Sequence, residues 1–162
     1  VITHAATGAA NVAALVYVAA FAPDRGERGG DLLARFGVPP LATALVPDTA
    51  GFVTIDRARF HDVFAADLPV DEARVLACSQ GPVAARCFED VTGAPAWRER
   101  PSWYLVARQD GAIPPELQKF MANRMGAHVT EVDSSHLPLL SHPDVVADAI
   151  RTAAHTAVRT AS

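Results

Sequence analysis

Apolar residues gather into one long run near the start of the chain. Residues 12–21, VAALVYVAAF, are continuously apolar and rich in valine and alanine, and the Pro/Gly/charged segment APDRGERGG ends the run. The length of this run and its sharp end predict a strand buried on both faces, as in a parallel sheet, with a single buried helix as the alternative. Residues 1–9 have the pattern of a helix that ends near Gly8, because glycine commonly terminates helices.

The second half of the chain alternates strand and helix patterns. SWYLVA predicts a second buried strand that ends at Ala107, and the alternation over 128–132 predicts a third. Between them, PPELQKFMANRMG predicts a helix that begins at proline and stops at Gly126. HPDVVADAIRTAAHTAV predicts a final amphipathic helix, with Ser141 as its N-cap. This order is typical of a parallel α/β sheet.

Shorter and more mixed patterns fill the region between these segments. DLLARFGVPP predicts a short helix that stops at glycine, and GFVTIDRARF begins with the alternation of a small strand. DLPVDEARVLACSQGPVAARCF predicts two helical pieces broken at its Gly-Pro pair. We therefore expect a small, mostly helical insertion and divide the chain into part of a core at 1–30, the insertion at 31–95, and further core at 96–162.

Composition limits the classes of function. The 162 residues suffice for one domain; half are hydrophobic and a fifth are charged, which is typical of a soluble globular protein. The net charge of −4 is spread without blocks, so we expect no nucleic-acid partner and no membrane partner. The first 21 residues are apolar but lack a basic opening region, which argues against a signal peptide. A cytoplasmic location is the expectation.

The cysteines and histidines show no metal-binding spacing. Cys78 and Cys87 have no CxxC or histidine companion, so we expect buried free thiols rather than a zinc site or a disulfide. No HxxxH or HExxH pattern occurs among the histidines. We therefore expect no metal and no cofactor.

Two residues of catalytic type follow the second and third predicted strands. Asp110 comes soon after the second strand and His136 soon after the third, 26 positions later. In parallel sheets, functional groups gather at the carboxyl ends of the strands, so both loops are expected at one edge. A carboxylate there can accept the imidazole N–H and fix the tautomer. Alternatively, Asp110-Gly111 is only a turn and His136 an ordinary loop histidine.

Four stretches of the chain resemble the α/β-hydrolase superfamily, and the second half resembles it most closely. Within that superfamily the chain is similar to bacterial esterase-like hydrolases related to plant methyl-ester esterases and hydroxynitrile lyases. The stretches are VITHAATGAANVAALVYVAAFAPDRGE, ARVLACSQGPVAARCFED, PAWRERPSWYLVARQDGAIPPELQKFMANRMGAH and EVDSSHLPLLSHPDVVADAI. The resemblance implies that the predicted strands are the last three of the hydrolase sheet and that 31–95 is a cap. It also implies that Asp110 is the triad acid and His136 the general base.

The resemblance implies a serine nucleophile that this chain does not contain. The nucleophile elbow, G-x-S-x-G, would lie directly before Val1, and none occurs in the 162 residues. Ser79 is better explained as the end of a helix, and Ser134 and Ser135 are too close to His136 on one loop. Ser102 lies at the wrong end of its strand. We therefore expect the C-terminal part of a hydrolase, inactive by itself.

By resemblance, the expected reaction is hydrolysis of a small-molecule carboxylic ester. Hydroxynitrile lyases carry a lysine directly after the histidine, whereas this chain has Leu137, which favours ester hydrolysis. Phe21, Ala22 and Leu137 are candidates for an apolar pocket wall, with ordinary packing as the alternative. Cofactor-free haloperoxidase-like chemistry would use the same triad. A different alternative is a catalytically inactive remnant or binding module of the same fold.

The predicted strand at 12–21 would normally pair with the strand that leads to the nucleophile. Without that neighbour, one edge of an apolar strand has unpaired backbone N–H and C=O groups. We therefore expect this edge to pair with a missing N-terminal segment, to form a homodimer, or to cause aggregation.

Overall fold

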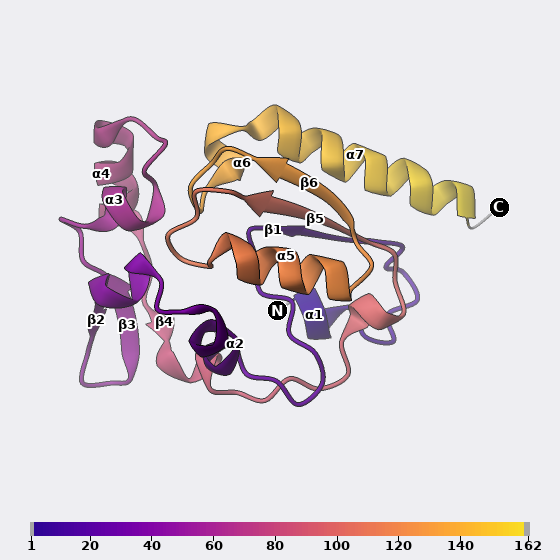
Figure 1. Cartoon of the computed structure of the whole chain (residues 1–162), viewed down its shortest axis with the longest axis horizontal. Helices are drawn as coiled ribbons and strands as arrows, with labels where there is room; N and C mark the ends of the chain where they lie inside the picture. Colours follow the sequence, from indigo (N-terminus) through magenta and orange to yellow (C-terminus); the bar gives the residue numbers. More distant parts are fainter. Residues whose placement is uncertain (1, 161–162) are drawn as a thin grey trace.

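The computed structural model describes residues 2–160, and its centre is a three-stranded parallel sheet in the order β1-β5-β6 (Figure 1). The strands are β1 (Leu15–Val18), β5 (Ser102–Ala107) and β6 (His128–Val132). Tyr17 of β1 pairs with Tyr104 of β5. The parallel sheet predicted from the hydrophobic pattern is confirmed, although β1 is shorter than the predicted 12–21.

Burial differs between the centre and the edges of this sheet. All residues of β5 are buried, which explains why its sequence is uniformly apolar or small. In β1, Leu15 and Tyr17 are buried whereas Val16 and Val18 are only half-buried. The prediction of burial on both faces is therefore wrong for β1, because β1 is an edge strand within residues 2–160.

One helical layer covers each face of the sheet. Helix α5 (Pro115–Arg124) packs on the face that carries Tyr17 and Tyr104, and its Leu117 and Met121 are fully buried there. Helix α7 (Pro143–Thr160) contacts β1 and β5 from the other side (Figure 1). The short helix α1 (Ile2–Ala5) packs against the 3₁₀ turn η3 (Ala96–Arg98). The helix expected over 1–9 is shorter than predicted, because it ends at Ala5 and turns follow it up to Gly8; residue 1 lies outside the described residues.

Residues 31–95, here called the cap segment, contain more strand than expected. The helices are α2 (Gly29–Phe36, which begins before the segment), α3 (Phe60–Phe64) and α4 (Val70–Ser79), with 3₁₀ turns η1 (Pro40–Ala44) and η2 (Ala85–Phe88). An antiparallel sheet joins β2 (Leu45–Pro47), β3 (Phe52–Ile55) and β4 (Val83–Ala84). The second helical piece predicted after Gly81-Pro82 is wrong, because β4 pairs with β3 there and only a 3₁₀ turn follows.

Two further expectations need correction. Cys78 and Cys87 are free but exposed, because both lie on the solvent side of the cap segment. Ser141 does not cap the last helix: it ends the short helix α6 (Pro138–Ser141), and His142 O accepts the first bond of α7, from Val146 N.

The β-strands of the central sheet point toward the cap segment. In Figure 1 the arrowheads of β5 and β6 end on the side where α3, α4 and the small sheet lie. None of the helices within residues 2–160 combines the length and the hydropathy required to cross a bilayer.

Candidate active site

The loops that follow β5 and β6 are held together beyond the ends of the strands. Arg108 N donates to Val132 O at 2.9 Å, and Gln109 N donates to Ser134 O at 3.0 Å. These bonds continue the strand pairing into both loops. They bring Asp110 and His136 together, with His136 Nδ1 2.8 Å from Asp110 Oδ2.

The carboxylate of Asp110 is buried and fully hydrogen-bonded. Its side chain is 0% exposed. Oδ1 accepts from the backbone N–H groups of Ala112 at 2.7 Å and Ile113 at 3.0 Å. Oδ2 accepts from Gln118 Nε2 at 2.7 Å and faces His136. Because an ionised carboxylate only accepts, His136 Nδ1 must carry the proton in this pair. Nε2 is then the basic nitrogen of the neutral ring.

Close contact with the cap segment explains why the residue after Asp110 is a glycine. A Cβ at Gly111 would lie 2.6 Å from the backbone oxygen of Val63 in α3. Gly111 O also accepts from Leu41 N of the cap segment at 2.9 Å. The Asp-Gly pair is therefore more than a turn signal, since the missing side chain lets the acid loop lie directly against the cap segment.

The histidine loop is anchored to the cap segment by side chains. The single hydroxyl proton of Ser135 is shared between Asp67 Oδ1 and Phe64 O, which lies 3.2 Å from Oγ. The Phe64 ring packs against the His136 ring, with 4.6 Å between the ring centroids. Ser134 is fully buried, and its hydroxyl lies 2.9 Å from Ser141 Oγ. His136 itself remains 20% exposed.

Asp67 is ionised more readily than an ordinary aspartate. Burial raises its pKa, but the hydroxyl groups of Ser135, Ser141 and Ser134 and the backbone N–H of Ser135 lower it, and the net pKa lies below the usual 3.8. His142 Nδ1 lies 4.0 Å from Asp67 Oδ2. The cap segment thus presents a negative charge to the hydroxyl groups of the histidine loop.

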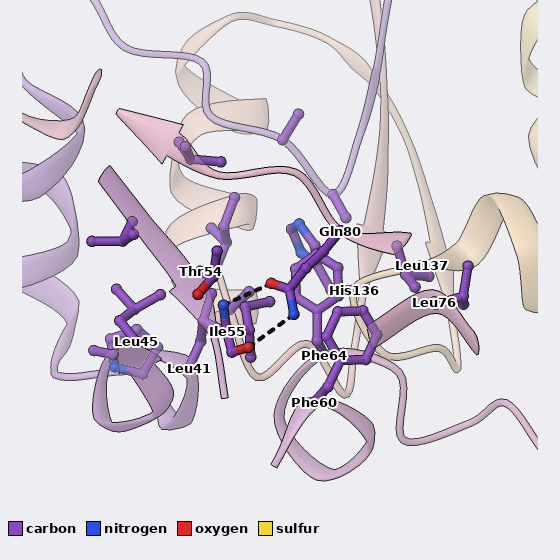
Figure 2. A pocket seen from close by; sticks show the side chains of 18 of the residues that line it. Leu41, Leu45, Thr54, Ile55, Phe60, Phe64, Leu76, Gln80, His136 and Leu137 are labelled. Carbon is purple, nitrogen blue, oxygen red and sulfur yellow. Dashed lines mark hydrogen bonds between the residues drawn. The ribbon is translucent and has the colours of Figure 1, made fainter. Parts of the chain in front are cut away.

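His136 lines a large apolar cavity between the sheet edge and the cap segment, with a volume of about 670 Å³. Figure 2 shows His136 beside Phe64, with Leu137, Leu76 and Ile55 around the same space. Gln80 also borders it, but its amide bonds Ile55 N at 2.7 Å, Ile55 O at 2.8 Å and Ala77 O at 2.9 Å. The cavity therefore offers little polar surface besides the imidazole.

Two of the three predicted pocket residues line this cavity. Phe21 and Leu137 do so. Ala22 does not: it is 0% exposed and belongs to the core, where its N–H faces Met121 Sδ at 3.2 Å. The prediction is wrong for Ala22 because the chain has already turned away from the cavity after Phe21.

That turn begins at Ala19, whose backbone has φ 44°. This left-handed conformation costs an L-residue roughly 1–2 kcal/mol. Ala19 N still bonds Leu105 O at 3.0 Å, and the Tyr104 hydroxyl donates to Ala20 O. Burial raises the pKa of Tyr104, which keeps the hydroxyl protonated for this bond. The strained turn leaves Ala20 and Phe21 against the cavity and takes the chain into the core at Ala22.

Sequence reasoning missed four residues of this site: Phe64, Asp67, Gly111 and Gln118. Gln118 had a usable signal, because it falls beside Leu117 on the buried side of a predicted helix, where a polar residue needs a partner. Phe64 and Asp67 lie far from His136 in sequence, and only the fold brings them near. No cluster of three metal-binding side chains occurs within residues 2–160.

Comparison with known proteins agrees with this architecture. A model of the alpha/beta hydrolase family matches residues 1–149. The alpha/beta hydrolase nvfD of Aspergillus novofumigatus is 42% identical over 65 residues, which are 39% of this chain and 26% of that protein.

Solved structures share the fold at low identity. Polyneuridine aldehyde esterase has a TM-score of 0.72 and 13% identity over 90% of this chain and 64% of its own. A pyrethroid hydrolase from Sphingobium faniae JZ-2 has a TM-score of 0.66 and 22% identity, over 87% of this chain and 60% of its own. The methylesterase MES16 from Arabidopsis has a TM-score of 0.65 and 16% identity, over 89% of this chain and 60% of its own. The chain thus spans less than two thirds of each of these proteins. Because the family model covers most of its length, the chain belongs to the alpha/beta hydrolase family.

Proposed function

We propose that this chain supplies the acid and the general base of a serine hydrolase that cleaves carboxylic esters. The observation that carries the proposal is the 2.8 Å contact between His136 Nδ1 and Asp110 Oδ2 beside an apolar cavity. Relatives of the same fold named as an esterase, a methylesterase and a pyrethroid hydrolase support ester hydrolysis. Leu137, in place of the lysine of the lyases, favours hydrolysis over lyase chemistry.

In the proposed mechanism, His136 Nε2 takes the proton of a serine hydroxyl while the serine oxygen bonds the ester carbonyl carbon. The imidazolium that forms is stabilised by the Asp110 carboxylate. His136 then returns the proton to the leaving alcohol as the ester C–O bond breaks. Water repeats the cycle on the acyl-enzyme and releases the acid and the free serine. These steps need no cofactor.

The cavity favours esters whose acyl or alkyl group is apolar and uncharged. Its walls are mostly aliphatic and aromatic, and the side-chain amide of Gln80, which borders it, is hydrogen-bonded to the backbone of Ile55 in the cap segment. Transfer of an unpaired charge into such a space is strongly unfavourable. An aryl butyrate should therefore be hydrolysed with a kcat/KM about 100-fold above that of an aryl hemisuccinate, whose acyl group carries a carboxylate. Equal rates would contradict this substrate class.

The nucleophile, in this proposal, comes from a segment outside residues 1–162. We expect an in-frame G-x-S-x-G upstream of the Val1 codon and aryl-ester hydrolysis by the longer protein. His136→Ala should then lower kcat by about 10³-fold or more. His155→Ala, at an exposed histidine of α7, is the matched control. A loss of only a few-fold would remove His136 from the mechanism, and absence of the upstream motif would favour an inactive remnant or binding module.

We also propose that the free edge of β1 pairs with another strand. Within residues 2–160, β1 pairs only with β5, and half-buried Val16 and Val18 lie along it. The chain by itself should therefore self-associate through this edge. Sedimentation velocity over a range of concentrations tests this, and a stable monomer with one cooperative melt would contradict it.

A further inference from the structure

Gln118 is a buried polar residue at the base of the acid loop. It lies in the first turns of α5, and it is 0% exposed. Glutamine is seldom fully buried unless its amide is hydrogen-bonded. Nε2 donates to Asp110 Oδ2 at 2.7 Å and to Ile113 O at 2.8 Å, and Oε1 accepts from Ala107 N at 3.0 Å.

These three bonds reach three separate points of one loop. Ala107 is the last residue of β5, Asp110 carries the carboxylate, and Ile113 directly precedes the Pro114-Pro115 start of α5. The amide therefore serves as the centre around which the loop folds. With two backbone N–H groups on Oδ1, and Gln118 and His136 on Oδ2, all four acceptor positions of the carboxylate are used.

The chemistry of an amide suits this position. A neutral donor orients Oδ2 without adding positive charge, so the carboxylate keeps its full attraction for the imidazolium that forms at His136. A lysine or arginine donor would neutralise part of that attraction. A hydrophobic side chain would leave Oδ2, Ala107 N and Ile113 O without their partner inside the core.

We propose that Gln118 is a positioning residue of the dyad: it fixes the Asp110 carboxylate so that Oδ2 receives the Nδ1–H of His136. Its consequence for turnover rests on the proposed function. The hydrogen bond itself lies wholly within this chain and can be measured without a nucleophile or a substrate.

The decisive variant is Gln118→Glu. The new side chain has nearly the same size, but when ionised it brings a second negative charge against Asp110 Oδ2 and the acceptor Ile113 O. Only the protonated form can donate one of the two lost bonds. Positioning therefore predicts that the Asp110–His136 bond becomes pH-dependent in Gln118→Glu. Gln109→Glu is the matched control. Gln109 is exposed in the same loop, so the substitution adds the same charge, whereas the glutamine that donates to the Asp110 carboxylate is Gln118.

The experiment is nitrogen and proton NMR of the full chain with labelled histidine, with His136 assigned from the His136→Gln spectrum. The wild type and Gln109→Glu should show the same low-field Nδ1–H resonance over the same pH range. In Gln118→Glu that resonance should be lost as pH rises and should recover on acidification. In Gln118→Leu it should be lost at all pH values. Melting curves establish that each variant is folded, and if Gln118→Leu does not fold, the two glutamate variants decide alone.

If folded Gln118→Glu keeps the wild-type Nδ1–H resonance of His136 at every pH, the proposal is overturned. Gln118 would then only fill space in the loop. In the longer enzyme, the same variant should lower kcat by about 100-fold with little change in KM, as expected for a misplaced catalytic group. Loss of the resonance in Gln118→Glu without any ester hydrolysis by the wild-type enzyme would sustain the positioning role and refute the proposed function instead.

Discussion

The two loops that meet at the candidate site are held in different ways. The carboxylate of Asp110 takes its hydrogen bonds from its own loop and helix, through Ala112, Ile113 and Gln118. The loop of His136 is held by the cap segment, through Asp67 and Phe64. The carboxylate of Asp110 is therefore held by its own loop and helix, whereas the loop of His136 depends on contacts with the cap segment.

This difference suggests how the site is assembled. Apart from His136, the donors to the Asp110 carboxylate lie within eight positions of it in sequence, although Leu41 N of the cap segment also bonds Gly111 O in the same loop. The loop of His136 is bonded across 71 positions of sequence, from Phe64 to Ser135. Changes in the cap segment should accordingly disturb His136 while leaving the hydrogen bonds of Asp110 in place.

The largest effect is expected at Gly111, where the acid loop itself touches the cap segment through its backbone. Gly111→Ala places a Cβ 2.6 Å from Val63 O, so either the loop or α3 must shift. We expect a loss of about 3 kcal/mol in the free energy of unfolding, from denaturant melts. Gly81→Ala is the control, because a Cβ there has open space. Equal stability of the two variants would show that the close approach is absent in solution.

Ser135→Ala tests the anchor of the histidine loop. It removes the hydroxyl shared with Asp67 and Phe64 O and should cost about 2 kcal/mol, as for a hydrogen bond to a charged group. The chemical shifts of His136 should change, whereas the backbone amides of Ala112 and Ile113 should not. Equal changes in both loops would contradict the separation of their anchors.

A smaller effect should appear as a function of pH. The folded pKa of Asp67 lies below its ordinary 3.8, so its ionised form stabilises the fold above that pH, and the contribution is lost as the pH falls further. The stability difference between the wild type and Asp67→Asn should therefore be constant near neutral pH and shrink below about pH 4. His142, 4.0 Å from Asp67, should be examined in parallel with His142→Ala. A difference that grows on acidification would contradict this sign.

Much of the fold could be predicted because its signals are local. The apolar run of β5 and the proline-to-glycine pattern of α5 predict both elements. Their order along the chain predicts that Asp110 and His136 share one edge of the sheet. Strands β2 and β4 have three and two residues, too few for a period to appear, so they were missed. The prediction that Ala22 lines the pocket is wrong because the left-handed turn at Ala19 is not marked by a glycine in the sequence.

Contacts between the cap segment and the histidine loop could not be predicted from the sequence. Ser134 and Ser135 have the composition of an exposed turn, yet both are buried, because Asp67 and Ser141 supply partners from elsewhere in the fold. Gln118 could be predicted in part. The sequence places it on the buried face of a helix, but it does not show that Asp110 is its hydrogen-bond partner.

The tautomer of His136 in the neutral chain is the most direct measurement of the central claim, that a buried ionised carboxylate at position 110 holds the imidazole. The nitrogen shifts of the ring distinguish which nitrogen carries the proton. The structure predicts a proton on Nδ1 and an unprotonated Nε2, and a loss of this preference in Asp110→Asn. A neutral ring protonated on Nε2 in the wild type would contradict the account.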